Sequence, residues 1–396
     1  MTERLYDTDA YGVVFDATVV SAEKDGDNTM VVLDRTFFFP EEGGQEADRG
    51  TIEGLKVLDV KHKGEDIFHL VEGTLECGEK VHGIVDWEFR FRNMQMHSGE
   101  HIFSGLVFRN YGFHNVGFHL SENSATMDFD GKLTAEDIRS IEMQVNRIIA
   151  ENHPIRAWYP NEEELALIPY RSKKALEGPV RLVEVEGTDI CACCATHVHA
   201  TAEIGCFLVT SFENYKGGVR LYYLAGLRAL EYINECRDSL IEISRLLSTK
   251  TDNVKENVTK LLDETKQLRF RLMNAERENI AGKIRDYYLR DGGDADNLQT
   301  IECGKALFLQ ADNSILRHTM DEMERYYSGI CAVFNGDDEN GYRYLVESKT
   351  CNVSDLQIEL RTQLQAKGGG APNSVSGSIA SKKEDILRIL EKYNCK

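Results

Sequence analysis

Residues 94–108, MQMHSGEHIFSGLVF, combine the apolar spacing of a helix with two histidines placed four residues apart. Residues i and i+4 lie on one face of an α-helix, so both imidazoles can point towards a single ion. Further along the chain, residues 193–197, CCATH, offer a thiolate and a third imidazole at the same spacing. Three nitrogen ligands and one thiolate suit zinc. The sequence therefore predicts one zinc site formed by His97, His101, Cys193 and His197.

Other interpretations of these two segments remain open. Three nearby side chains could replace one of the four ligands: Cys191, Cys194 and His199. Residues 97–101 also match the H-x-x-E-H pattern of inverted zinc peptidases, in which the glutamate, here Glu100, activates a metal-bound water. That interpretation lacks a third carboxylate ligand and leaves the second segment without a role. Two histidines at helical spacing also occur in ordinary helices, so neither segment is decisive alone.

The composition is that of an acidic globular protein. The 396 residues include 66 Asp and Glu against 46 Lys and Arg, giving a formal net charge of −20, and 42% of them are hydrophobic. This length predicts two or three domains. Because phosphate binding depends on clustered cations, the charge excludes a general nucleic-acid coat and restricts such contacts to local patches. There is no apolar run of about 18 residues. Residues 1–12 lack the features of a signal peptide, which predicts a cytoplasmic protein.

The hydrophobic pattern changes along the first half of the chain. Residues 1–90 contain short β-prone runs with turn signals at Asp25-Gly26 and Glu72-Gly73, which favours a small β domain, either a barrel or an open sheet. Residues 91–228 mix helical stretches with β-prone runs. In this second part we predict helices at 94–108 and 135–152, and strands at 180–183 and 219–224.

A helical repeat follows. Residues 229–292 carry apolar side chains at steps of three, four and seven, which predicts long packed helices. Residues 248–253 interrupt the repeat, and Asn253 with Glu256 fits the start of a helix, so two helices are expected. These helices could pair with a second copy in a homodimer, or form an antiparallel hairpin within one chain.

The last part, residues 293–396, returns to alternating helices and strands, which predicts a compact α/β domain. Helices are expected at 314–327 and 353–365, and strands at 329–335 and 343–348. Residues 367–373, KGGGAPN, predict a loop. Residues 381–384, SKKE, fit a capping box that opens a final amphipathic helix.

A second segment suited to binding lies in the β domain, at residues 36–45, TFFFPEEGGQ. Its two glycines permit a positive φ and the close approach of a ligand. The amide of Gln45 can donate and accept hydrogen bonds at once. The alternative is a hairpin turn with exposed polar residues.

Four segments occur here in the order found in one known family. They are T-x-F-x-P-x-x-G-G-Q beginning at Thr36, residues 92–105 with their two histidines, residues 117–120 (GFHL), and residues 193–205. Together they resemble the editing domain of alanyl-tRNA synthetases and of the free-standing alanyl-tRNA editing proteins. The family's second metal motif usually reads Cys-Gly-Gly-Thr-His, and Cys194 and Ala195 replace the two glycines here. The tail around residues 368–370 resembles the C-terminal globular domain of that family, which implies its long form.

With this resemblance, the expected fold is α+β in four parts. They are a small β-barrel domain at 1–90, an α+β zinc-containing editing domain at 91–228, a helical linker at 229–292, and a C-terminal α/β domain for tRNA binding or oligomerisation at 293–396.

The resemblance implies a trans-editing hydrolase that removes serine or glycine from mischarged tRNA(Ala). Thr36 and Gln45 are the candidates for recognising the serine hydroxyl. Glu100 is the candidate base, unless it is only a solvated helix carboxylate. The candidates for tRNA binding are Lys367, Gly368, Gly369, Gly370, Lys382 and Lys383. A non-catalytic tRNA-binding protein with structural zinc is the remaining alternative, because four protein ligands close a tetrahedral zinc.

Overall fold

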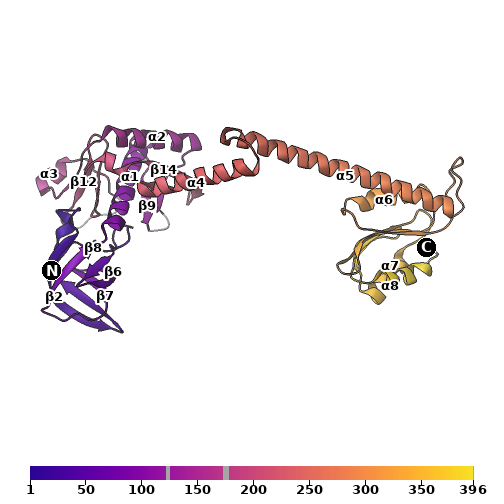
Figure 1. The fold of residues 1–396 in the computed structure, drawn as a ribbon, viewed down its shortest axis with the longest axis horizontal. Coiled ribbons are helices and arrows are strands. Elements are labelled where there is room, and N and C mark those ends of the chain that lie inside the picture. Colours follow the sequence, from indigo (N-terminus) through magenta and orange to yellow (C-terminus); the bar gives the residue numbers. More distant parts are fainter. Residues whose placement is uncertain (122–124, 173–177, 396) are drawn as a thin grey trace. The chain divides into compact units, whose positions relative to one another are not determined.

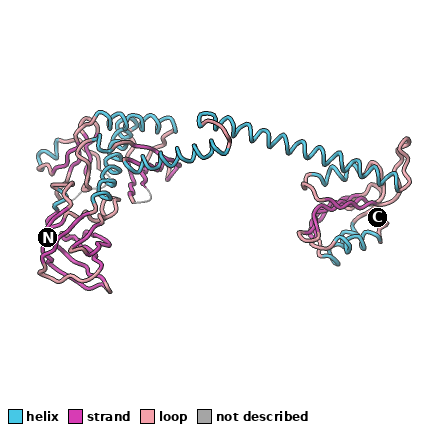
Figure 2. Tube along the Cα trace, in the orientation of Figure 1, coloured by secondary structure: helices cyan, strands magenta, loops and turns pink. Residues whose placement is uncertain are grey.

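The computed structural model describes residues 1–121, 125–172 and 178–395, and the protein is mixed α and β, as the sequence predicts (Figure 1). The chain forms two compact units, Met1–Glu242 and Ile243–Lys396. Figure 2 shows helices and strands in both units. None of the described helices is long and apolar enough to span a lipid bilayer.

The first unit begins with a β-barrel. Six strands pair in the closed order β2-β3-β7-β6-β5-β8. Side chains alternate between the two faces of a strand, and a buried set that includes Val19, Val31 and Val57 forms a hydrophobic core. The turn predicted at Asp25-Gly26 joins β2 to β3, with Gly26 at φ 63°. The six strands are β2 (Val14–Asp25), β3 (Asn28–Leu33), β5 (Gly50–Ile52), β6 (Leu55–Lys63), β7 (Asp66–Glu72) and β8 (Lys80–Val85), and β1 (Glu3–Arg4) pairs separately with β4 (Arg35–Thr36).

Helix α1 (Trp87–Tyr111) follows the barrel and extends the predicted helix at both ends. Asp86 caps its first turn by accepting a hydrogen bond from Phe89 N, and Gly112 ends it in the left-handed region at φ 71°. Every residue from 93 to 107 is buried. A helix covered on all sides needs no polar face, which is why polar and apolar residues alternate freely along this one.

Two sheets and a second long helix contact α1. Helix α2 (Ala135–Glu151) confirms the helix predicted at 135–152, and Thr134 with Asp137 forms its capping box. The predicted strands at 180–183 and 219–224 correspond to β12 and β15, with β12 shifted by two residues. One sheet has the order β14 (Phe207–Tyr215), β15 (Gly218–Ala225), β10 (Ala125–Phe129), β9 (Asn115–Leu120), and the other has β11 (Ile155–Trp158), β12 (Leu182–Val185), β13 (Asp189–Ala192). The short helices are α3 (Glu162–Leu167) and η2 (Thr201–Ile204), in addition to η1 (Leu5–Asp7) near the start of the chain.

A fully buried ion pair joins α1 to the barrel. Arg90 of α1 and Asp48, which follows the Gly-Gly-Gln segment, are both 0% exposed at the side chain. The Arg90 guanidinium also donates to the main-chain oxygens of Ala10 and Phe37, and Asp48 accepts from Phe39 N. Each charge is thus both paired and hydrogen-bonded, which is the condition for burying it.

The helical stretch consists of two helices, as predicted. Helix α4 (Leu227–Leu246) ends before the interruption, and α5 (Val254–Arg290) starts after the short helix η3 (Thr251–Asn253). The helix start predicted at Asn253 is confirmed, because Asn253 is the N-cap residue of α5, although its side chain makes no capping bond. Its main-chain oxygen accepts a hydrogen bond from the side-chain amide of Asn257, and α5 begins immediately after η3.

The second unit is built on a sheet of five strands in the order β16-β17-β18-β20-β19. Helices α5 and α6 lie on one face of this sheet, and α7 and α8 lie on the other (Figure 1). Its strands are β16 (Lys305–Leu309), β17 (Cys331–Asp337), β18 (Gly341–Glu347), β19 (Lys367–Ala371) and β20 (Ser374–Ile379). Its shorter helices are α6 (Ile315–Met323), α7 (Ser354–Leu364) and α8 (Lys383–Glu391).

Two local predictions in this unit are wrong. Residues 367–373 were expected to form a loop, but Lys367–Ala371 is strand β19, paired antiparallel with β20. Three consecutive glycines have low strand propensity, so only the long-range pairing reveals the strand. The capping box at residues 381–384 is also absent, because the capping residue is Lys382 and its side chain makes no such bond. The amide of Lys383 instead donates to Asp338 Oδ1 at 2.7 Å.

Removing one partner of the buried ion pair should strongly destabilise the first unit. In an Asp48→Ala variant the Arg90 guanidinium stays buried without its carboxylate, which lowers the free energy of unfolding by about 3–5 kcal/mol. Trp87 and Trp158 are the only tryptophans and both belong to this unit, so their fluorescence in urea follows it alone. As a control, Asp59→Ala removes one side of a solvent-accessible ion pair in β6 and should barely move the midpoint. Equal shifts in the two variants would contradict this assignment.

Candidate metal centre

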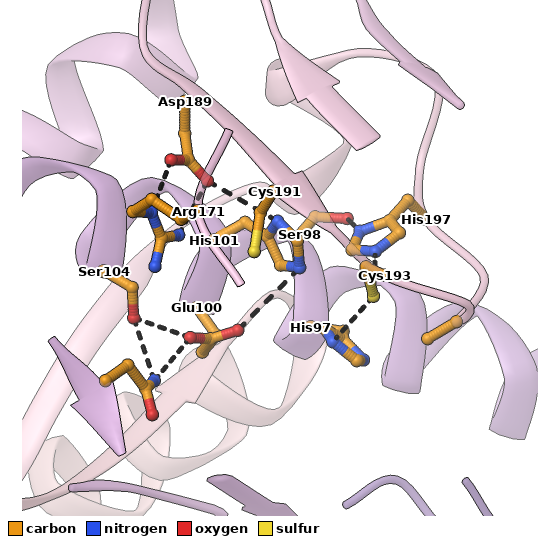
Figure 3. Close-up of polar contacts among 12 residues, drawn as sticks. His97, Ser98, Glu100, His101, Ser104, Arg171, Asp189, Cys191, Cys193 and His197 are labelled. Carbon is orange, nitrogen blue, oxygen red and sulfur yellow. Dashed lines mark hydrogen bonds and ion pairs between the residues drawn. The ribbon is translucent and has the colours of Figure 1, made fainter. Parts of the chain in front are cut away.

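Four side chains from two parts of the first unit converge on one point. His97 and His101 project from α1, while Cys193 and His197 belong to the loop that follows β13 (Figure 3). One ligand atom from each lies within 4.8 Å of the ligand atoms of the other three. The three imidazoles are at most 4% exposed, and Cys193 is partly exposed. The structure thus brings together the four residues that the sequence predicts as metal ligands.

Two of the imidazoles make a hydrogen bond through Nδ1, the outer ring nitrogen, which faces away from Cys193. These bonds fix the orientation of the two rings. Gln45 Oε1 lies 2.8 Å from His97 Nδ1, and Ser98 Oγ lies 3.0 Å from His197 Nδ1. The two Nε2 atoms face Cys193 Sγ, at 3.6 Å for His97 and 3.5 Å for His197. Sulfur and nitrogen ligands at their usual distances from a tetrahedral zinc are about 3.6 Å apart. These three side chains therefore already have the spacing that such an ion requires.

The remaining imidazole, His101, lies against a buried ion pair. Its Nδ1 is 3.7 Å from Asp189 Oδ2, and Asp189 accepts two hydrogen bonds of 2.7 Å from the Arg171 guanidinium. His101, Asp189 and Cys191 form a second group of closely spaced ligand atoms. Burial raises the pKa of the Cys191 thiol to about 12, which keeps it protonated, and Asp189 is already paired with an arginine. This second group therefore suits a metal poorly.

Glu100 lies inside the protein, so the expectation of a solvated helix carboxylate is wrong. Its side chain is 0% exposed, and its Oε1 accepts hydrogen bonds of 2.6 Å from both Ser104 Oγ and Asn115 Nδ2. Its Oε2 is 4.0 Å from His101 Nε2. A buried carboxylate therefore stands directly beside one of the candidate ligands.

The Gly-Gly-Gln segment is a tight hairpin turn packed against His97 of the four-residue cluster. Glu42 and Gln45 exchange main-chain hydrogen bonds of 3.2 and 3.1 Å around Gly43 and Gly44. Both glycines have positive φ, and a Cβ on Gly44 would lie 2.3 Å from the main-chain oxygen of Phe118. Only glycine fits there. The alternative of a hairpin turn is thus confirmed, but its exposed polar residues are wrong for Gln45, which is 0% exposed and whose Nε2 has no hydrogen-bond partner in the described part of the chain.

Thr36 belongs to the same motif, but its hydroxyl contacts His69 of the barrel, whereas Gln45 contacts His97 of the cluster. The Thr36 hydroxyl lies 2.9 Å from His69 Nε2 and accepts a hydrogen bond from Phe38 N. Burial lowers the pKa of His69 to about 4, so this imidazole is neutral at pH 7 and its Nε2 can accept from Thr36. Both hydrogen-bonding roles of the Thr36 hydroxyl are therefore used inside the barrel.

The other possible ligands lie outside the four-residue group. The ring of His199 stacks on Tyr11 with centroids 3.9 Å apart. Burial raises the pKa of the Cys194 thiol, whose sulfur faces Gly43. Neither Cys194 nor Ala195 has a positive φ, so this loop does not need the glycines that are usual in the family.

The residues expected to contact tRNA are all in the second unit. Lys367, Gly368, Gly369 and Gly370 form most of β19 and are exposed. Lys382 and Lys383, at the start of α8, are exposed too. None of these lysines forms an ion pair with a carboxylate in the described ranges of the chain.

Sequence reasoning missed the residues that surround the ligands. Ser104 follows Glu100 by four residues on α1, so helical spacing could have indicated their contact. Asn115, Arg171 and Asp189 come from separate elements, and no local pattern links them to the histidines. Their role is visible only in three dimensions.

Two known protein families match parts of the chain, one over the barrel and one over the segment that carries Cys193 and His197. Residues 3–89 match the family described as class II tRNA synthetases (A). Residues 180–222, which contain Cys193 and His197, match the second additional domain of threonyl and alanyl tRNA synthetases.

Relatives with known names cover nearly the whole chain. The sequence is 30% identical to the alanyl-tRNA editing protein AlaX-L of Pyrococcus horikoshii, over 99% of this chain and 98% of the relative. It is 27% identical to the alanyl-tRNA editing protein Aarsd1 of Danio rerio, over 98% and 97% of the two chains. An alanine–tRNA ligase of Ignicoccus hospitalis is 29% identical over 100% of this chain, which spans 43% of the ligase. The chain therefore belongs to the alanyl-tRNA editing proteins of the long form, and it is an aminoacyl-tRNA deacylase.

Proposed function

We propose that this protein hydrolyses the ester of serine or glycine on mischarged tRNA(Ala), acting in trans at a zinc-containing site. The observation that supports this most is the buried cluster of four ligands with the Gln45 amide beside it. The chemical need follows from selectivity: a synthetase pocket shaped for a methyl group neither excludes glycine well nor strongly rejects an added hydroxyl. A second site must therefore remove both products.

The residues of the cluster fit zinc in donor type and spacing. His97, His101, Cys193 and His197 would hold the ion. Because four protein ligands close a tetrahedral zinc, bound zinc would supply a Lewis acid beside the ester that joins the amino acid to the ribose only where one of the four is displaced. Gln45 and Ser98 hold the outer nitrogens of two imidazoles, which fixes the orientation of their rings.

Gln45 is our candidate for recognising serine. With His97 Nε2 turned towards the metal position, its Nδ1 carries the proton and donates to Gln45 Oε1. The amide is thereby oriented, and its Nε2 is left as a buried donor with no partner among the described residues. A serine hydroxyl can accept from this donor. An alanine methyl group would leave it unpaired, at a cost of about 1–3 kcal/mol, whereas glycine is small enough to leave space for a water molecule that accepts from it.

Glu100 is our candidate base. Its Oε1 is held by Ser104 and Asn115, while its Oε2 is near His101 Nε2 and so close to the metal position. A carboxylate fixed by two donors on one oxygen can still take a proton on the other. Thr36, whose hydroxyl is engaged with His69, would shape the barrel behind Gln45 without touching the amino acid.

The second unit is our candidate for holding the body of the tRNA. In a chain with net charge −20, the exposed lysines Lys367, Lys382 and Lys383 offer cations that carboxylates do not neutralise within the described residues. The glycines of β19 add main-chain amides that side chains do not cover. Exposed apolar residues on α5, such as Leu261, Leu268 and Leu272, would suit pairing with a second copy of the chain.

The peptidase interpretation explains less of the site. It uses Glu100 with His97 and His101 but gives no role to Cys193 and His197, which complete the same cluster. It also leaves unexplained why a turn with Gln45 is packed against His97.

Purified protein should contain about one zinc ion per chain, and a Cys193→Ala variant should lose both zinc and the release of serine from Ser-tRNA(Ala). The thiolate is one of the four donors, so its loss opens the site. Zinc is measured by elemental mass spectrometry, and Cys194→Ala, which removes the neighbouring thiol, is the matched control and should keep both properties. If Cys193→Ala loses zinc but releases serine at the wild-type rate, the metal takes no part in hydrolysis.

A Gln45→Leu variant should lower kcat/KM on Ser-tRNA(Ala) by about 10- to 100-fold, because the hydroxyl loses its donor. The loss on Gly-tRNA(Ala) should be several times smaller, because glycine offers no hydroxyl. Parallel single-turnover assays on the two substrates give the ratio, and Gln144→Leu on α2 serves as the control. Equal losses on both substrates would show that Gln45 only supports His97.

Replacing Lys367, Lys382 and Lys383 together by alanine should weaken tRNA binding and reduce its salt dependence. For every phosphate that the variant no longer neutralises, the slope of log K against log salt should fall by about one. The control is Lys392→Ala, since Lys392 in the same unit is paired with Glu359 at 3.1 Å. Filter binding over a range of salt concentrations gives the slope, and an unchanged slope in the triple variant would place the tRNA-binding surface elsewhere.

A further inference from the structure

The loop that carries Cys193 and His197 has no regular secondary structure to hold it. Residues 193–198 follow β13 and belong to neither a helix nor a strand. Two ligands on such a loop keep a fixed separation only if the main chain between them is held from outside. Three main-chain groups of this loop are bonded to one residue, Arg181.

Arg181 contacts the loop with both its main chain and its side chain. Its main-chain oxygen accepts a hydrogen bond of 3.0 Å from Cys193 N. Its Nη1 donates to the oxygens of Cys193 at 3.1 Å and Ala195 at 2.9 Å. These bonds fix the main chain on both sides of Cys194. They act on backbone atoms, so they do not depend on which side chains stand at the two positions that are usually glycine.

A carboxylate from the start of the chain stabilises the guanidinium. Arg181 is 7% exposed, and its Nε is 3.9 Å from Asp7 Oδ1. Asp7 also accepts a hydrogen bond of 3.1 Å from the Tyr159 hydroxyl. A charge this deeply buried needs an opposite charge nearby, and Asp7 supplies it. Next to Asp7, Tyr6 packs with Phe39 and Ala195, so the same N-terminal turn also contacts the loop directly.

We propose that Arg181 is a positioning residue of the editing site. It fixes the loop so that Cys193 Sγ and His197 Nε2 stay at the separation that a bound metal needs, and Asp7 holds its guanidinium in place. The inference rests on the proposed zinc site and adds to it a residue that touches neither the metal nor the substrate. Lysine cannot take this role fully, because its single nitrogen would have to serve both carbonyl oxygens, as Nη1 does, and has no second nitrogen to lie beside Asp7 as Nε does.

The test measures how fast the metal leaves the intact protein. Wild type, Arg181→Met and Arg181→Lys are loaded with zinc, and metal loss to an excess of a coloured chelator is followed in time. The control is Arg156→Met, which removes an arginine that is 71% exposed and paired with Glu184, a residue of the strand β12 that follows Arg181. Cobalt-loaded samples report the ligand geometry through their thiolate charge-transfer absorption, and circular dichroism checks that each variant is folded.

We expect Arg181→Met to lose zinc about 10- to 100-fold faster than wild type and to alter the cobalt spectrum. Arg181→Lys should lose zinc at a rate between those of wild type and Arg181→Met, and Arg156→Met should lose it at the wild-type rate. Asp7→Asn should also lose zinc faster than wild type. For Ser-tRNA(Ala), kcat should fall in Arg181→Met while KM changes little. If Arg181→Met does not fold, Arg181→Lys decides the outcome, since it keeps the charge.

Wild-type rates and an unchanged cobalt spectrum in a folded Arg181→Met variant would overturn the positioning role while leaving the zinc site intact. If Arg181→Met does not fold, a wild-type rate of zinc loss in Arg181→Lys would overturn the positioning role in the same way. A wild-type protein that binds no zinc would overturn the zinc proposal itself and this inference with it. The two failures are therefore distinguishable by the behaviour of the wild type alone.

Discussion

The buried ion pair between Arg90 and Asp48 joins helix α1, which carries His97 and His101, to the segment that carries Gln45. Arg90 lies seven residues before His97, two helical turns along the same side of α1. Asp48 lies three residues after Gln45, and its carboxylate also holds the main chain at Phe39. The pair thus ties the helix that carries two histidines to the segment that carries the glutamine. The 2.8 Å contact between Gln45 and His97 joins the same two segments.

Around the cluster, the side chains that hold the ligands come from different elements of the first unit. Gln45 comes from the barrel, Ser98 from α1 itself, Asp189 from β13, and Arg181 from the segment before β12. A site assembled in this way depends on the whole unit being folded. The polar groups buried near this point orient the four candidate ligands, and their hydrogen bonds offset the loss of water.

The sequence predicted features set by neighbouring residues, such as helices, but not contacts between residues that are far apart along the chain. The spacing of His97 and His101 follows from the helical repeat, and the limits of α2 were predicted to within a residue because its cap and its amphipathic pattern agree. The Gly-Gly-Gln segment was recognised, but nothing in it indicated that Gln45 would be buried while Thr36 would turn to His69. Likewise Arg171 and Asp189 are 18 residues apart and meet only through the sheet. Strand β19 escaped notice because pairing with β20 outweighs the low strand propensity of its glycines.

Strand β19 also has a consequence for the behaviour of the protein in a crowded solution. It is the outermost strand of its sheet, and on its far side it pairs with no other described strand. All five of its residues are exposed, and three are glycines with no side chain to keep a neighbouring chain away. Such an open margin is a template for self-association into fibrous aggregates. The charge of Lys367 at one end and Pro372 just beyond the other are the features that keep this margin short and solvated.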